Sequence, residues 1–102
     1  MIRQTDKPTA LTHFMGHRFS ASYNELAREF GEPLEGDGYK VTSEWSLEID
    51  GGVFTIYDWK ERHMPSESPD LDFTWHIGAH DAETAEAALQ EVQRLLAEFW
   101  DC

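Results

Sequence analysis

Cysteine is almost absent from this chain of 102 residues, since the only one is Cys102 at its end. No intramolecular disulfide and no CxxC metal or redox pair can form within the chain. Chains without disulfides are typical of reducing compartments. No apolar run is long enough for a signal peptide, and none approaches the ~20 residues of a membrane span. We therefore expect a soluble protein of the cytoplasm.

Basic residues are scarce as well. Eight lysines and arginines stand against twenty acidic residues, which gives a net charge of −12. This charge repels nucleic acids and anionic membranes over a Debye length, so direct binding to either is disfavoured. Two interpretations stay open: the charge only keeps the protein soluble, or an acidic face docks on a basic groove of a partner, such as a nucleic-acid channel.

Sequence motifs of catalysis are missing. The sequence contains no HExxH, P-loop, GxGxxG or GxSxG motif, and it has no nucleophilic cysteine apart from the terminal one. His76 and His80 have the spacing of metal ligands on a helix. However, His76 lies in a predicted strand, and Gly78 would break a helix there. We expect no enzyme activity, no metal and no cofactor.

The composition indicates one globular domain over residues 1–102. Hydrophobic residues make up 40% of the chain and aromatic residues 13%, enough to offset the entropy of ordering a single core. Residues 1–10 are polar, contain Pro8 and show no periodicity, so they predict a flexible tail. Residues 11–19 predict a short edge strand or an irregular packed segment.

Two helices are predicted. Ser22 and Glu25 form a capping-box pattern, so a short helix should begin at Tyr23, and Gly31 and Pro33 should end it. Asp81 should cap a second helix that runs to about residue 100. Its apolar stripe should cover the sheet and consists of Ala85, Ala88, Leu89, Val92, Leu95, Leu96 and Phe99.

Strands are predicted between these helices. Residues 41–49 alternate between apolar and polar, Asp50-Gly51-Gly52 provides a tight turn, and residues 53–60 return. Residues 73–78 predict a third strand. The sequence thus predicts an α+β domain of two layers in the order α-β-β-β-α, with a three-stranded antiparallel sheet packed by a short N-terminal and a long C-terminal helix.

The register of the hairpin decides which of its side chains are buried. A two-residue turn places Phe54 and Ile56 in the core beside Trp45, whereas a three-residue turn with a bulge would bury Tyr57 and Trp59 instead. We favour the two-residue turn because it buries the two apolar side chains.

Two surfaces are candidates for partner binding. With the two-residue turn, one sheet face presents aromatic, acidic and imidazole groups, which are Glu44, Glu48, Tyr57, Trp59, Thr74 and His76. The alternative is that Tyr57 and Trp59 pack beneath the long loop or the short helix. The second surface is the outer side of the C-terminal helix, where carboxylates spaced along a rod could imitate a row of phosphates or could simply be solvated; these are Glu83, Glu86, Glu91 and Glu98.

Asp58 and His76 have structural explanations. Because side chains alternate along a strand, Asp58 should lie on the face opposite to Tyr57 and Trp59, next to Trp45. A carboxylate buried there needs hydrogen-bond partners. We therefore predict that Asp58 forms a salt bridge or caps the backbone. His76 could act as an acid or base near neutral pH, but a single histidine on a strand favours a structural role.

Several short segments resemble small proteins encoded by bacteriophages and prophages, which are mostly of unassigned function. These segments are FGEP at residues 30–33, YK at 39–40, EW at 44–45, TIYDWK at 55–60 and WHIGAH at 75–80. The resemblance covers about residues 22–88, and relatives often carry glycine where Ala79 stands here. It implies a phage or prophage origin and supplies no catalytic residues.

Three functional hypotheses follow. Small acidic phage proteins often inhibit host defence systems, so the resemblance favours an anti-CRISPR type inhibitor that binds a basic groove in a host protein or ribonucleoprotein complex. The alternative is a small-molecule-binding protein that holds a nucleotide signal with Tyr57, Trp59 and His76. An enzyme that uses His76 with Glu44 or Asp58 is the weakest hypothesis. An uncovered sheet face would favour a homodimer.

Overall fold

The computed structural model describes residues 2–5, 12–35, 41–50, 52–59 and 64–100. Six strands, two α-helices and one short 3-10 helix follow each other along this part of the chain. In order they are β1 (Ile2–Gln4), β2 (His13–Ser22), α1 (Tyr23–Phe30), β3 (Leu34–Glu35), β4 (Ser43–Ile49), β5 (Gly52–Tyr57), η1 (Pro65–Glu67), β6 (Asp72–Ala79) and α2 (Ala82–Trp100).

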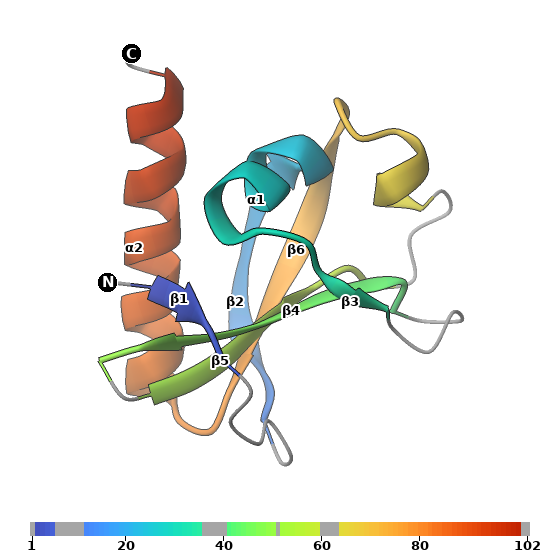
Figure 1. Ribbon diagram of the computed structural model, residues 1–102. Helices are drawn as coiled ribbons and strands as arrows, with labels where there is room; N and C mark the ends of the chain where they lie inside the picture. The colour runs from blue at the N-terminus through green and yellow to red at the C-terminus, as the bar shows by residue number, and fades with distance from the viewer. Residues whose placement is uncertain (1, 6–11, 36–40, 51, 60–63, 101–102) are drawn as a thin grey trace.

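All the strands join one antiparallel sheet with the order β1-β4-β5-β6-β2, and β3 pairs with β4 outside this path. β1 pairs with residues 47–49 of β4, and β3 pairs with residues 43–44. The α+β class therefore fits, but the predicted three-stranded sheet and the α-β-β-β-α order are wrong. Figure 1 shows why: segments from before and after α1 return to the hairpin and extend its sheet.

The strand that the sequence most underestimated is β2. It runs for ten residues along β6 as an edge strand, and its register shifts between Phe14 and Arg18. Gly16, inside this bulge, has a φ of 92°, a conformation that glycine adopts without steric cost. Because the bulge interrupts the alternation of side chains, the sequence predicted only a short or irregular segment there.

Within residues 1–10, for which a flexible tail is predicted, Ile2–Gln4 forms strand β1. Arg3 pairs with Glu48 at 3.2 Å between Nε and Oε1. The Gln4 side-chain amide donates to the carbonyls of Phe30 and Glu32 and so ties β1 to the end of α1. Residues 6–10 lie outside the described part of the chain.

Both predicted helix starts are confirmed. The backbone N–H of Glu25 donates to Ser22 Oγ at 3.1 Å, and the N–H of Ser22 donates to Glu25 Oε1 at 3.0 Å. Gly31 follows α1 with a φ of 83°. At the second helix, the N–H of Thr84 donates to Asp81 Oδ1 at 2.7 Å, which is the expected capping bond.

The hairpin has the two-residue turn. Ile49 pairs with Gly52 and Trp45 pairs with Ile56, so the two paired strands are separated by two residues. Asp50 has a φ of 49°, as a tight antiparallel turn requires. The register therefore buries Phe54 and Ile56 completely.

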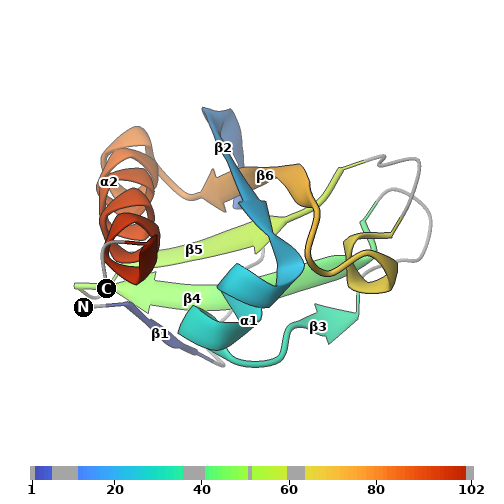
Figure 2. The same ribbon diagram turned by 90° about the horizontal axis from the view of Figure 1, so that it is seen from above.

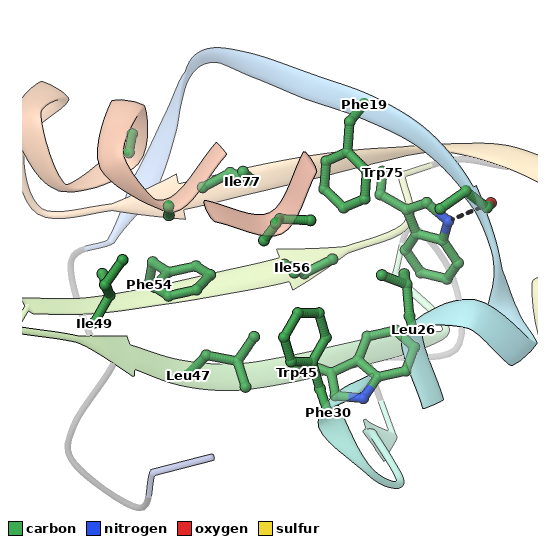
Figure 3. Packing of buried hydrophobic residues seen from close by; sticks show 14 of the residues in the cluster. Phe19, Leu26, Phe30, Trp45, Leu47, Ile49, Phe54, Ile56, Trp75 and Ile77 are labelled. Carbon is green, nitrogen blue, oxygen red and sulfur yellow. Dashed lines mark hydrogen bonds between the residues drawn. The ribbon is translucent and has the colours of Figure 1, made fainter. Parts of the chain in front are cut away.

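One face of the sheet forms the core with α1 and α2 (Figure 3). The rings of Trp45 and Trp75 meet edge to face with centroids 5.4 Å apart. Each indole N–H has an acceptor: Trp45 donates to the Gly31 carbonyl at 2.7 Å and Trp75 to the Ala21 carbonyl at 2.9 Å. Seen from above, α2 lies near the turn between β4 and β5, and η1 lies near the opposite ends of these strands (Figure 2).

The apolar stripe of α2 faces the core, as the sequence predicts. Ala85, Ala88, Val92 and Leu96 of α2 are buried in the core, and Leu89 and Leu95 are partly buried against it. The side chain of Phe99 lies outside the described part of the structure. From α1, Leu26 and Phe30 enter the same core.

Candidate functional site

The opposite face of the sheet carries a row of polar and aromatic side chains that crosses four strands. Glu44 of β4 pairs with Tyr57 of β5, Tyr57 pairs with His76 of β6, and His76 pairs with Arg18 of β2. Because side chains alternate along a strand, these residues point away from their core neighbours Trp45, Ile56 and Ile77. We call Glu44, Tyr57, His76 and Arg18 the cross-strand row. It runs from a carboxylate to a guanidinium.

Four ring-bearing side chains on this face, Phe14, Tyr57, Trp59 and His76, line a pocket with a volume of about 430 Å³, which we call the aromatic pocket. Tyr57 stacks on His76 with ring centroids 5.7 Å apart and planes 23° apart. Phe14 meets His76 edge to face at 5.0 Å, and Trp59 meets Tyr57 edge to face at 6.4 Å. Phe14 and Trp59 remain 39% and 41% exposed, so both offer ring surface to a ligand.

Gly78 makes room for this arrangement. It lies between Thr55 and Phe14 in the neighbouring cross-strand position. A Cβ atom at residue 78 would lie 2.8 Å from Thr55 Oγ1 and 3.4 Å from Tyr57 Cε1. The missing side chain lets the Tyr57 ring lie close to the sheet, where it stacks on His76.

Burial sets the protonation of the row. It raises the pKa of the Glu44 carboxyl, and burial together with the nearby Glu44 charge raises the pKa of the Tyr57 phenol. Burial and the Arg18 charge lower the pKa of His76, while the Asp58 charge opposes this shift. Tyr57 and His76 are therefore both uncharged at neutral pH, and the pocket wall is apolar in character.

Sequence reasoning missed two residues of the site, Phe14 and Arg18. The guanidinium carbon of Arg18 lies 5.6 Å from the centroid of the Phe14 ring, in cation–π contact. Among the described residues no carboxylate pairs with it, whereas Arg3 pairs with Glu48, and Arg94 pairs with Glu91 and Glu98. Only the pairing of β2 with β6 places Arg18 beside His76, and the bulge conceals that pairing in the sequence.

Only some of the site residues predicted on the sheet face come together in the structure. It brings Tyr57, Trp59 and His76 together and places Glu44 next to Tyr57. Thr74 lies exposed on the same face, opposite Ser20. Glu48 also lies on this face, but only 6% of it is exposed and it is paired with Arg3, so the expected contact role of Glu48 has no accessible carboxylate to support it.

The carboxylates of α2 are largely engaged within the chain. Glu86 accepts from Gln90 at 3.0 Å and contacts His17 Nε2 at 3.0 Å. Arg94 reaches Glu91 and Glu98, each at 2.5 Å. Glu83 lies in the first turn, where a negative charge interacts favourably with the helix dipole. These contacts reduce the resemblance of α2 to a row of phosphates.

Asp58 has the structural role that the sequence predicts. Only 1% of the residue is exposed, and its carboxylate accepts from the Thr42 N–H, the Thr42 hydroxyl and the Ser43 N–H. The prediction of a backbone cap is confirmed. A carboxylate used in this way is not available as a base for His76.

A larger hollow of about 840 Å³ lies between α1 and the start of β6. Most of the residues that line it have polar or charged side chains; they are Ser22, Asn24, Glu25, Ala27, Arg28, Asp70 and Asp72. Asn24 already donates to Asp70 Oδ1 at 2.6 Å and to the Pro69 carbonyl at 3.0 Å. This hollow lacks aromatic surface, so the aromatic pocket is the stronger candidate.

Within the described ranges, no three histidine, cysteine or acidic side chains are placed to hold a metal ion. None of the helices described is long and apolar enough to cross a membrane.

Comparison of the chain with protein-family models, with curated proteins and with solved structures finds no match.

Proposed function

We propose that this protein acts by binding and that the aromatic pocket is its contact site. The observation that carries the proposal is the convergence of Phe14, Tyr57, Trp59 and His76 on the sheet face opposite the helices. A volume of about 430 Å³ is within the usual size of ligand sites, about 300–1,000 Å³. Large rings bury much area at low entropic cost, which is why they are enriched at contact surfaces.

The biological role that we propose is inhibition of a host defence complex by a protein of phage or prophage origin, in the cytoplasm of the host cell. The segments TIYDWK and WHIGAH motivate this role by their resemblance to phage proteins. The net charge of −12 supports a protein or ribonucleoprotein partner with a basic groove over direct contact with nucleic acid or membrane. A homodimer through the same sheet face would compete with this partner.

The aromatic pocket is a better contact site than the acidic helix. Glu86, Glu91 and Glu98 each already contact a side chain of the same chain, and a partner would have to replace those contacts. In contrast, Phe14 and Trp59 expose about two fifths of their surface. Exposed tryptophan is among the residues most enriched at binding hot spots.

The test is a pull-down of purified host defence complexes with the wild-type chain and two variants. Trp59→Ala removes one ring of the pocket, while the double variant Glu86→Lys with Glu91→Lys reverses charge on α2. We expect Trp59→Ala to weaken capture at least tenfold, in the range of a hot-spot residue, and the charge reversal to have a smaller effect. Thermal unfolding of each variant checks that it remains folded.

Three outcomes would contradict the proposal. If the charge reversal abolishes capture and Trp59→Ala does not change it, α2 is the contact site. If both variants bind like the wild type, the partner uses neither surface. If no defence complex is captured and the chain does not protect a phage from defence in cells, the inhibitory role is wrong.

A second candidate function is the binding of a small molecule, a nucleotide signal, and one observation supports it. The structure places Arg18 directly beside His76 and Phe14. An aromatic pocket with a cation at its rim suits a ligand that has both a planar ring and an anionic group.

A further inference from the structure

We infer that the aromatic pocket and Arg18 together bind a 5′-mononucleotide, with the base against the rings and the phosphate at the guanidinium. This inference rests on the second candidate function, a protein that binds a nucleotide signal, and it uses the same pocket. It adds the chemical class of the ligand and a residue, Arg18, that does not line the pocket itself.

The base is recognised by the rings. Tyr57 and His76 already stack in a nearly parallel arrangement, 23° between planes, and Phe14 and Trp59 stand edge-on at the sides, at 73° to His76 and 79° to Tyr57. A planar base fits such a set of walls because every base has a π-face that stacks on an aromatic side chain. Stacking of this kind tolerates different bases, so the pocket need not select one.

The phosphate is recognised by Arg18. The guanidinium lies 5.6 Å from the Phe14 ring centroid, and its charge acts on His76, so it is adjacent to two pocket walls. Its fork of N–H donors matches two phosphate oxygens. In a chain with twenty acidic residues, an arginine that no described carboxylate neutralises has its charge available for an external anion.

The same observations favour a mononucleotide over a nucleic-acid strand. A strand brings a phosphate at every nucleotide, and neutralising these phosphates needs several cations along its path. The cross-strand row offers one guanidinium, at its Arg18 end, and a carboxylate at its Glu44 end. The net charge of −12 repels a polyanion much more strongly than a single phosphate.

The experiment is isothermal titration calorimetry of the full chain. The ligands are the 5′-monophosphates of adenosine, guanosine, cytidine and uridine, the four nucleosides, inorganic phosphate and a single-stranded decanucleotide. The variants are Arg18→Gln and, as a matched control with the same charge change, Arg94→Gln on α2. We expect at least one monophosphate to bind, Arg18→Gln to weaken it at least tenfold, and Arg94→Gln to change it less than twofold.

The nucleosides separate the two parts of the site. We expect the matching nucleoside to bind at least tenfold more weakly than its monophosphate and equally well to the wild type and Arg18→Gln. Equal affinity for nucleoside and monophosphate would overturn the role of Arg18. Equal loss in both arginine variants would reduce that role to net charge. Tighter binding of the decanucleotide would overturn the assignment to mononucleotides.

The inference and the proposed function fail in different experiments. If no monophosphate binds while Trp59→Ala still abolishes capture of a defence complex, the pocket is a protein contact and the mononucleotide assignment is wrong. If monophosphates bind as expected but no complex is captured, the ligand assignment holds and the inhibitory role of the pocket does not.

Discussion

Asp58 and Thr42 are joined by two hydrogen bonds: Oδ1 accepts from the Thr42 N–H at 2.8 Å and Oδ2 from the Thr42 hydroxyl at 2.6 Å. Thr42 precedes β4 and Asp58 follows β5, so the carboxylate fastens the open end of the hairpin, opposite the turn at Asp50. Trp59 is the next residue and lines the aromatic pocket. The same buried carboxylate thus stabilises the fold and fixes the backbone beside the site.

Replacement of this carboxylate should destabilise the protein strongly. In Asp58→Ala, the N–H groups of Thr42 and Ser43 lose their shared acceptor, and a hydrogen bond to a charged group contributes about 1.5–3 kcal/mol. We expect the free energy of unfolding in urea to fall by about 3 kcal/mol. The control is Asp72→Ala at the exposed start of β6, with an expected change within about 0.5 kcal/mol. A loss below about 1 kcal/mol for Asp58→Ala would contradict the role assigned to Asp58.

Glu44→Gln should stabilise the folded protein at neutral pH. Burial raises the pKa of Glu44 above its ordinary value of 4.5, so the folded state binds the proton more readily than the unfolded state. The ionised carboxylate therefore disfavours the fold once the pH exceeds the raised pKa, and this penalty disappears as the pH falls below 4.5. The variant should unfold at higher urea concentration than the wild type at pH 7, by an amount that vanishes in acid.

A second measurement on Glu44→Gln tests its contact with Tyr57. The Glu44 charge is one cause of the raised Tyr57 pKa, after burial. Absorbance titration of the phenol should therefore show a lower Tyr57 pKa in the variant. An unchanged phenol titration together with reduced stability at neutral pH would mean that Glu44 makes a favourable contact.

Gly78→Ala should disturb the pocket without replacing any of its rings. The new methyl group would lie 2.8 Å from Thr55 Oγ1 and 3.4 Å from Tyr57 Cε1, so Thr55 must move and the Tyr57 ring gains a close contact. Overpacking of this kind costs about 1–3 kcal/mol, and we expect a loss of about 1–2 kcal/mol in the free energy of unfolding. The NMR signals of the Tyr57 ring, and of the His76 ring that stacks on it, should shift because the new methyl group crowds Tyr57. Thr74→Ala, exposed on the same strand and face, should leave those signals in place.

Local patterns in the sequence were sufficient for the hairpin and the helix starts. Asp50-Gly51-Gly52 indicates where the tight turn lies. Burial of Phe54 and Ile56 then selects the register that the structure has. The Ser22 and Glu25 pattern is equally local, since its two hydrogen bonds span three residues. Such features are visible in the sequence because their partners are near neighbours along the chain.

The remaining strands and half of the site depend on distant partners. Arg18 comes to face His76 only after the bulge around Gly16 shifts the register of β2, which removes the alternation that would reveal a strand. Phe14 reaches the pocket through the same shift. The three residues of β1 are too few to show any period, and the pairing of Arg3 with Glu48 follows from that strand.

Protonation of His76 should make the folded state less stable in mild acid. Burial lowers the pKa of His76, the Arg18 charge lowers it further, and the Asp58 charge acts in the opposite sense. Because the unfolded state binds this proton more readily, the contribution of His76 to stability is present above the ordinary pKa of 6.5 and is lost as the pH falls through the lowered value. His76→Gln should therefore lose less stability than the wild type between pH 7 and pH 5, the region in which histidine titrates.

The contribution of Arg18 to this shift can be isolated by NMR titration of the His76 ring. Arg18→Gln removes the positive charge that faces His76 across β2 and β6, so the pKa of His76 should rise toward its ordinary value. Arg94→Gln changes the net charge equally but lies on α2 in pairs with Glu91 and Glu98, and it should leave the His76 pKa unchanged. Equal pKa values in both variants and the wild type would show that the guanidinium does not act on the imidazole, and would remove the electrostatic link between Arg18 and the aromatic pocket.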